Sequence, residues 1–374
     1  SIVLRYTSEW RETVERMARW VDFDNDYKTM DRDFMESVWW VFKQLWDKGL
    51  IYEGLKVVPY SWRISTPLSN FEANLNYQDV QDPSVTLRFR VIGEPDSHLL
   101  AWTTTPWTLP SNMALCAGPE LTYVKLRECA SGTCYYLVKN RVEVHFESGS
   151  YEILEEMPGT ALQGMCYEPL FDFAKNHVDT SKAWTVQLDD YVSEESGTGL
   201  VHLACFGEDD VRIFQREGLP VFDPVDDEGN FRKSTDFIAG LNIKDADKPI
   251  VQRLKEEGKM FRHETVQHSY PFCWRTDPPL IYKPISTWFV NVEAFKERMV
   301  AHNRTVHWVP GHIRDGRFGK WLENARDWAI SRNRFWGTPL PIWKNEDGDI
   351  LCFGSVAELE GAVGQVIPDL HKQH

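Results

Sequence analysis

The chain has no paired cysteine motif, and its cysteines do not have the spacing of metal ligands. Seven cysteines are scattered along 374 residues without a single Cys-x-x-Cys. This usage argues against a disulfide-linked scaffold and is typical of a reducing compartment. A zinc site from Cys273, Cys352 and His268 stays open as an alternative, although these residues lack the usual ligand spacing. We therefore expect no bound metal.

Long apolar runs are also missing. No stretch approaches the roughly 20 apolar residues that a membrane helix needs, and no basic segment followed by an apolar one marks a secretory signal. We expect a cytoplasmic protein without a membrane partner. The chain begins at Ser1 rather than at a methionine, so we expect it to be part of a longer protein.

An excess of basic charge is absent as well. The net charge of −15 argues against a general nucleic-acid coat, because phosphate binding needs clustered Lys and Arg. The charge is nevertheless polarised: residues 301–345 carry eight Lys or Arg against three acids, and residues 183–210 carry seven acids and no base. A local basic path for nucleic acid is therefore still possible.

What is present indicates an α/β chain. Apolar residues at helical spacing run through residues 8–52, with one stripe over Val14–Val21 and a second over Phe34–Leu45 that Gly49 ends. Short strands with frequent turns follow from about 75 to 268, and a helix is expected at 245–257, before Gly258. Strands are expected at 55–60, 85–91, 98–102 and 135–138.

One uncharged segment stands out, Thr103-Thr104-Thr105-Pro106-Trp107-Thr108. Pro106 and Pro110 fix φ and remove backbone donors, so we expect no helix interior here. Because an apolar strand precedes them, the threonines should emerge at its end as a wall of hydroxyls. Such a wall suits recognition of a sugar or an ester better than covalent attack. An ordinary threonine-rich strand edge is the alternative.

A second segment lies about ninety residues later. Gly197-Thr198-Gly199 leads into a short apolar strand ending in His202, and Asp209-Asp210 follows. A lone histidine is usually structural, and acids at a helix start are usually caps.

Together the two segments resemble the editing site of class I aminoacyl-tRNA synthetases of the isoleucine type, and Pro106-Trp107-Thr108 distinguishes them from the leucine and valine types. The resemblance extends over nearly the whole chain. It implies a β-rich mixed editing domain at 58–268, inserted into a partial nucleotide-binding, Rossmann-like catalytic domain made of 1–57 and 269–374.

The resemblance also implies residue roles. Asp210 matches the carboxylate that holds the substrate's α-ammonium, with Asp209 as the fallback because this loop is one residue shorter than usual. His202 and Trp107 would bound the side-chain pocket. Four residues would complete the catalytic set with His202 and Asp210: Thr104, Thr105, Thr108 and Asn112. Thr103 and Leu109 would supply further substrate contacts. We expect a positioned water to attack, with a Cys205 nucleophile as the less favoured alternative.

The implied reaction is hydrolysis of valyl-tRNA(Ile). One methylene is worth only ~1–3 kcal/mol of selectivity in binding. A second, smaller site that admits and hydrolyses only the smaller product is therefore needed, and isoleucine enzymes are the usual example of this double sieve. The expected partners are the 3′ end of tRNA(Ile) and valine or isoleucine. The chain is expected to be a monomer or part of a larger synthetase assembly. A non-catalytic tRNA-binding or interaction module is the competing hypothesis.

Both ATP-binding signatures of the family, His-x-Gly-His and the Lys-Met-Ser-Lys-Ser-like loop, are missing from this sequence. We therefore expect no adenylate formation. No cofactor is expected for editing, and ATP and Mg would serve only the full-length enzyme. Trp288 and Trp336 are candidates for the amino-acid pocket of the incomplete synthetic site, with simple core packing as the alternative. Arg332 and Arg334 would meet phosphate or form a solvated face.

Overall fold

The computed structural model describes residues 2–68, 70–332, 337–345 and 347–371. The chain divides into two compact units, one made of Ser1–Gly54 with Thr287–His374 and the other of Leu55–Ser286. The β-rich unit thus interrupts the other in sequence, which agrees with the expected α/β architecture. The domain limits proposed from the sequence, at 58 and 268, stay predictions. Among the described helices, none combines the length and the apolar character required to cross a membrane.

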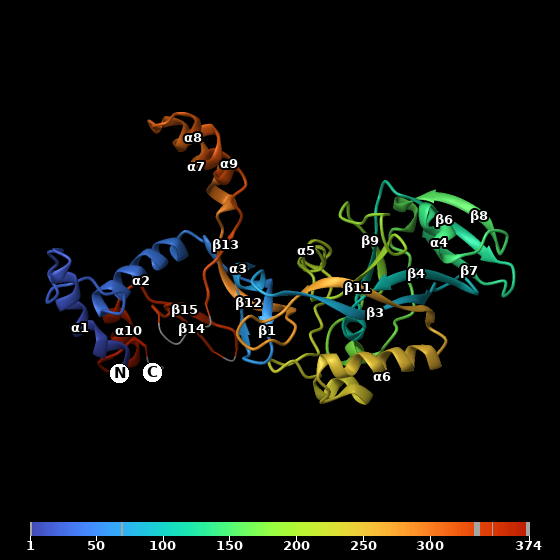
Figure 1. The fold of residues 1–374 in the computed structure, drawn as a ribbon, viewed down its shortest axis with the longest axis horizontal. Coiled ribbons are helices and arrows are strands. Elements are labelled where there is room, and N and C mark those ends of the chain that lie inside the picture. Colours follow the sequence, from blue (N-terminus) through green and yellow to red (C-terminus); the bar gives the residue numbers. More distant parts are fainter. Residues whose placement is uncertain (1, 69, 333–336, 346, 372–374) are drawn as a thin grey trace. The chain divides into compact units, whose positions relative to one another are not determined.

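The first unit consists of helices and short strands (Figure 1). Its elements are α1 (Ile2–Arg16), α2 (Arg32–Asp47), η6 (Glu293–Phe295), α7 (Lys296–Thr305), α8 (His312–Asp315), α9 (Arg317–Glu323), β13 (Trp328–Ala329), β14 (Ile342–Lys344), β15 (Ile350–Cys352) and α10 (Val356–Val363). The buried residues Met35 and Trp39 of α2 pack with Val356 and Leu359 of α10.

The helix predictions for this unit are confirmed in one case and wrong in the other. The second helix contains the predicted stripe, and Gly49 follows it with φ of 67°. The stripe over Val14–Val21 does not form one helix, because α1 ends at Arg16 and Ala18 has φ of 57°. A non-glycine residue in this region breaks the helical path, so periodicity alone overextended the helix.

The second unit begins with β1 (Ile51–Ser61), whose first residues belong to the other unit, and ends in β12 (Ile281–Val290). Between them lie β2 (Thr66–Pro67), α3 (Asn70–Ala73), β3 (Tyr77–Arg90), β4 (Ser97–Thr103), η1 (Pro106–Ser111), β5 (Ala114–Ala117), β6 (Thr122–Glu128), β7 (Cys134–Val138), η2 (Lys139–Arg141), α4 (Val142–His145), β8 (Tyr151–Pro158), η3 (Gly159–Leu162), η4 (Phe173–Asn176), β9 (Thr185–Leu188), β10 (Leu200–Leu203), α5 (Glu208–Glu217), η5 (Lys233–Ile238), α6 (Ile243–Glu256) and β11 (Met260–Pro271). The predicted strands at 55–60, 98–102 and 135–138 and the helix before Gly258 are confirmed.

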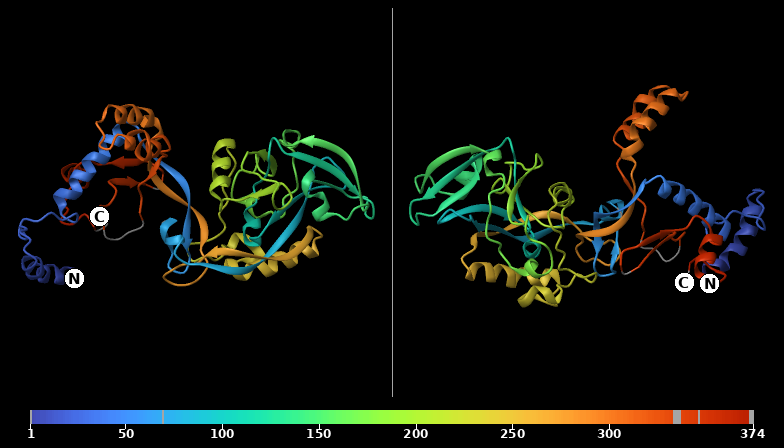
Figure 2. Two further views of the ribbon diagram at one scale, coloured as in Figure 1. Left: turned by 45° about the horizontal axis from the view of Figure 1, so that its top comes forward. Right: turned by 180° about the vertical axis from the view of Figure 1, so that it is seen from behind.

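A mixed nine-stranded sheet organises this unit. Its main path is β8-β6-β7-β4-β10-β5-β9, and β3 joins β4 to the long strand β11. Figures 1 and 2 show β3 and β11 side by side, with α6 alongside. The unit's large apolar core includes Phe89, Leu109 and Phe214, each at most 1% exposed. This core fixes the strand ends from which the candidate site is built.

Candidate active site

The two sequence motifs meet because their strands are neighbours. β4 and β10 run parallel, with Val201 opposite Trp102, so the threonine segment after β4 lies beside the end of β10. A cavity of about 430 Å³ opens there, within the second unit. Its lining includes Thr103, Thr104, Thr105, Trp107, Thr108, Tyr191, His202, Asp210, Tyr270 and Tyr282.

Three of the four threonines are bonded to one another. The Thr105 backbone N–H donates to Thr103 Oγ1 over 3.1 Å, and the Thr105 hydroxyl lies 3.2 Å from that of Thr103 and 3.3 Å from that of Thr108. The Thr104 hydroxyl has no hydrogen-bond partner among the described residues. The Thr104 hydroxyl is therefore free to bind a ligand. The Thr103 and Thr105 hydroxyls can do so by giving up the hydrogen bond between them.

The segment after the threonines differs from the expectation that prolines would exclude a helix. Pro106–Ser111 is a 3₁₀-helix with Pro106 at its first turn and Pro110 inside. Pro106 fits because the first helical N–H groups lack intrahelical acceptors anyway. The next donor, Trp107 N–H, bonds to Asp247 Oδ1 of α6 over 2.8 Å. A carboxylate distant in sequence thus caps the helix and fixes the tryptophan.

His202 is buried and fully engaged on both ring nitrogens. Asn112 Nδ2 donates to its Nδ1 over 2.9 Å, and Tyr167 donates to Asn112 Oδ1, which fixes the amide's orientation. The proton of His202 is thereby assigned to Nε2, which donates to Thr108 Oγ1 over 3.0 Å. The Thr108 hydroxyl in turn donates a hydrogen bond to the carbonyl oxygen of Thr105.

These hydrogen bonds and the burial of the ring determine whether His202 can act as a base. Burial lowers the pKa of His202 to about 3, so the ring stays neutral near pH 7. Its only acceptor nitrogen is already occupied by Asn112. His202 is therefore a rigid, neutral wall with one oriented donor and not a general base.

The adjacent acids have different environments. Asp210 is partly buried, lines the cavity and accepts from the Ala204 N–H through Oδ2 over 3.0 Å. Burial raises the pKa of its carboxyl to about 7, and the neighbouring Asp209 charge adds to the rise. Asp209 is exposed, pairs with Arg212 over 3.0 Å and is not among the cavity residues. Of the two, only Asp210 is placed to meet a ligand.

Of the other predicted site residues in this unit, Trp107 lines the cavity but Asn112 and Leu109 do not. Trp107 is 3% exposed and packs on Phe206, with ring centroids 4.7 Å apart. Asn112 and Leu109 do not line the cavity: Asn112 lies behind His202, and Leu109 is in the core.

The two tryptophans of the predicted synthetic pocket belong to the other unit. Trp288 packs against Trp46 and donates its backbone N–H to Ser331. Trp336, like Arg334, lies outside the described residues. Arg332 donates to the carbonyls of Ala329 and Ser331.

The thiol alternative finds no support in the geometry. Cys205 is fully buried, bonds to the carbonyl of Phe222 and does not line the cavity. Burial raises its pKa well above the usual value, which opposes thiolate formation. Over the described ranges, no three His, Cys, Asp or Glu side chains group in a way that could hold a metal ion.

Several cavity residues carried no signal in the sequence. Tyr191 follows a segment without a motif. Asp247 does not line the cavity but supports Trp107, which does, and it lies 140 residues from the backbone N–H that it caps. Tyr270 and Tyr282 belong to β11 and β12, and in the sequence nothing distinguishes them from other aromatic residues of a strand. These two tyrosines are distant in sequence from the two motifs, and only the folded unit brings them to the site.

Comparison with known proteins finds relatives over almost the whole chain. A family model described as tRNA synthetases class I (I, L, M and V) matches residues 1–368. An isoleucine--tRNA ligase of Bdellovibrio bacteriovorus is 54% identical over 99% of this chain and 35% of its own length. The cytoplasmic isoleucine--tRNA ligase of Mus musculus is 52% identical over 100% of this chain and 30% of its own. The chain thus spans about a third of the length of these relatives.

Among solved structures, one described as the crystal structure of GlLeuRS-CP1 matches 48% of this chain and 99% of its own. The TM-score is 0.37 and the sequence identity 12%. So distant a likeness does not bear on function. The family match alone covers almost every residue, and the chain belongs to the class I tRNA synthetase family.

Proposed function

We propose that this chain hydrolyses the ester of mischarged valyl-tRNA(Ile), using the cavity between β4, β10 and α5. The observation that carries the proposal is the pairing of a carboxyl, Asp210, with a hydroxyl wall across one cavity. An aminoacyl ester on ribose presents the complementary groups: an ammonium at one end and oxygen atoms at the other.

The geometry supports the following roles in this proposal. Asp210, as the carboxylate, binds the α-ammonium through a charge-assisted bond. Thr104 and Thr105 bind the terminal ribose and the ester carbonyl. His202 and Trp107 limit the space for the side chain. Hydrogen bonds at both nitrogens hold the His202 ring, and the backbone bond to Asp247 and packing on Phe206 hold Trp107, so both rings can exclude a larger group by contact.

The step needs no cofactor. Water adds to the ester carbonyl carbon, the bond to the ribose oxygen breaks, and a proton from the water ends on that oxygen. Since His202 is neutral and occupied and Asp210 is assigned to the ammonium, the proposal assigns the threonines to orienting the water. The substrate's own neighbouring ribose hydroxyl can relay the proton.

The proposal is confined to hydrolysis, since neither ATP-binding signature occurs in this sequence. ATP and Mg belong to the full-length enzyme. The expected partner is the 3′ end of tRNA(Ile), in the cytoplasm, with the chain as a monomer or part of a larger synthetase assembly.

The test is release of valine from two substrates, valyl-tRNA(Ile) and a small valyl ester of adenosine. We expect hydrolysis above buffer, reduced about 100-fold or more in Asp210→Ala and in Thr105→Ala, in line with the loss of one transition-state or charged contact. The small ester removes any need for tRNA-binding domains. If neither substrate is hydrolysed faster than in buffer while tRNA binds, the chain is instead a non-catalytic tRNA-binding module.

A further inference from the structure

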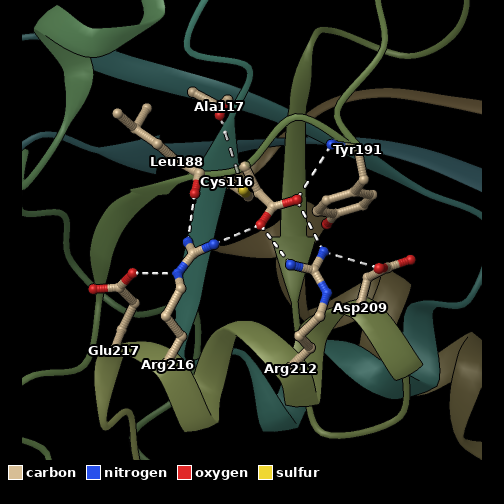
Figure 3. Close-up of polar contacts among 9 residues, drawn as sticks. Cys116, Ala117, Leu188, Tyr191, Asp209, Arg212, Arg216 and Glu217 are labelled. Carbon is tan, nitrogen blue, oxygen red and sulfur yellow. Dashed lines mark hydrogen bonds and ion pairs between the residues drawn. The ribbon is translucent and has the colours of Figure 1, made fainter. Parts of the chain in front are cut away.

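A buried carboxylate outside the cavity joins two pieces of its wall. Asp189 follows β9, and its side chain is 7% exposed. It accepts from Arg212 through both carboxylate oxygens over 2.9 Å and from Arg216 over 2.7 Å. Figure 3 shows the two guanidinium groups projecting side by side from their helix, with Tyr191 close by.

Both arginines belong to α5, one helical turn apart. Arg216 also donates to the carbonyl of Leu188, and the backbone N–H of Asp189 donates to that of Ala117. The face of α5 that carries Arg212 is therefore fixed to the ends of β5 and β9. These contacts leave no freedom for the helix to turn or slide without breaking charge-assisted bonds.

The same carboxylate holds a second part of the wall. The Tyr191 N–H donates to Asp189 Oδ1 over 3.2 Å, and Tyr191 lines the cavity. Asp210 lies on the first turn of α5, two residues before Arg212. One buried charge thus fixes both the tyrosine and the helix turn that presents Asp210.

The charge state of Asp189 is suited to this role. The Arg212 side chain lowers the pKa of the Asp189 carboxyl to about 2, so it is ionised throughout the pH range in which Asp210 titrates. Its two partners are half-exposed, and they can return to solvent if the carboxylate is removed. Loss of the contact would then free α5 rather than leave a buried positive charge.

We propose that Asp189 is a positioning residue, which sets the place of Asp210 against the substrate's ammonium by clamping α5 through Arg212 and Arg216. This inference rests on the proposed function. It also makes a prediction about the protein alone, because the Ala204 N–H donates to Asp210 Oδ2 and reports where that carboxylate lies.

The first measurement is amide hydrogen exchange in Asp189→Asn. The Ala204 amide should exchange about tenfold faster or more, the scale expected for losing bonds to a charged group. Asp172→Asn is the matched control, because it removes a carboxylate paired with Lys175 on the exposed surface of the same unit. Unchanged exchange at Ala204 in Asp189→Asn overturns the inference, whatever the activity.

The second measurement compares two small adenosine esters, valyl and its α-hydroxy analogue, which lacks the ammonium. Asp189→Asn should slow hydrolysis of the valyl ester about tenfold and leave the hydroxy ester within about twofold of the parent chain. Asp189→Glu, which keeps the charge, should recover part of the loss. Equal slowing of both esters would mean a general structural role and overturn the inference. A parent chain that hydrolyses neither ester overturns the proposed function instead.

Discussion

Asp209 and Asp210 differ by one position and have opposite environments. Asp209 is exposed and paired with Arg212, whereas burial raises the pKa of Asp210 to about 7. At pH 7 the Asp210 carboxyl is therefore protonated in a large fraction of molecules. A substrate ammonium needs the ionised form, so binding and deprotonation are linked.

This linkage predicts the pH dependence of hydrolysis. The value of kcat/KM for the valyl ester should rise as pH increases from 6 to about 7, because the neutral carboxyl is lost over this interval, and should level off or fall near pH 8 as the substrate's α-ammonium loses its proton. A pH-rate profile of Asp210→Asn should be lower and should lack this limb. A limb of the same midpoint in Asp210→Asn would assign it to another group.

Substitution of His202 should change which aminoacyl-tRNA is hydrolysed. Removing the ring in His202→Ala opens the wall without removing a base, since the ring is neutral and its acceptor nitrogen is occupied. Hydrolysis of isoleucyl-tRNA(Ile) should appear, with a gain of about tenfold or more, as expected when one methylene is newly accommodated.

The matched control for that change is Asn112→Ala. It removes the ring's support from behind the cavity but leaves the ring itself. Single-turnover assays of both variants with the two aminoacyl-tRNAs measure the effect. A His202→Ala variant that still ignores isoleucyl-tRNA(Ile) would mean that another side chain limits the pocket.

At the scale of elements, α6 supports the threonine segment through one side chain. Asp247 caps η1 at Trp107 N–H, and burial raises the pKa of its carboxyl to about 7. Asp247→Ala should lower the free energy of unfolding by about 1 kcal/mol, the usual loss for a helix cap, and should reduce hydrolysis. Urea denaturation at pH 7 measures the stability.

Asp247→Asn separates the cap from the charge. The amide oxygen can still accept from Trp107, so stability at pH 7 should be retained. In the parent chain the raised pKa makes folding stability fall as pH rises from about 4 to 7, and Asp247→Asn should reduce this slope. Equal losses in Asp247→Ala and Asp247→Asn would contradict the capping role.

The turn before β10 depends on a glycine for two separate reasons. Gly199 has φ of 75°, and a Cβ added there would lie 2.4 Å from Val138 Cβ. Gly164 has nearly the same φ, 76°, with no atom within 4 Å of the added Cβ. The pair therefore separates backbone strain from steric overlap.

Gly164→Ala should cost about 1–2 kcal/mol of stability, the penalty of a left-handed conformation. Gly199→Ala should cost about 1–3 kcal/mol more through overpacking, and it should displace His202 and slow hydrolysis. Chemical denaturation and the ester assay measure both. Equal destabilisation by the two variants would show that the β10 turn can relax.

Helices and strands whose signals lie within one short segment of sequence could be predicted from that segment. The helix before Gly258 and the strand that ends at the threonines were predictable because capping, turn residues and apolar spacing lie within one segment. The contacts Asp247–Trp107 and Asp189–Arg212 were not, since they join residues 140 and 23 positions apart. No spacing rule connects such pairs, because they meet only through the packing of helices against the sheet and its loops.

At the scale of the whole molecule, every residue that lines the cavity belongs to the unit Leu55–Ser286. The walls come from strands, a 3₁₀-helix and an α-helix that share this unit's core. The proposed hydrolysis therefore takes place within this one unit.

The proposed function requires that this cavity hydrolyse the smaller aminoacyl ester and reject the larger. The most direct measurement is the rate at which the chain deacylates valyl-tRNA(Ile) and isoleucyl-tRNA(Ile), assayed side by side under single-turnover conditions. We predict that valine is released rapidly from its tRNA and that isoleucine is released no faster than in buffer. Equal rates for the two, or no release of valine, would contradict it.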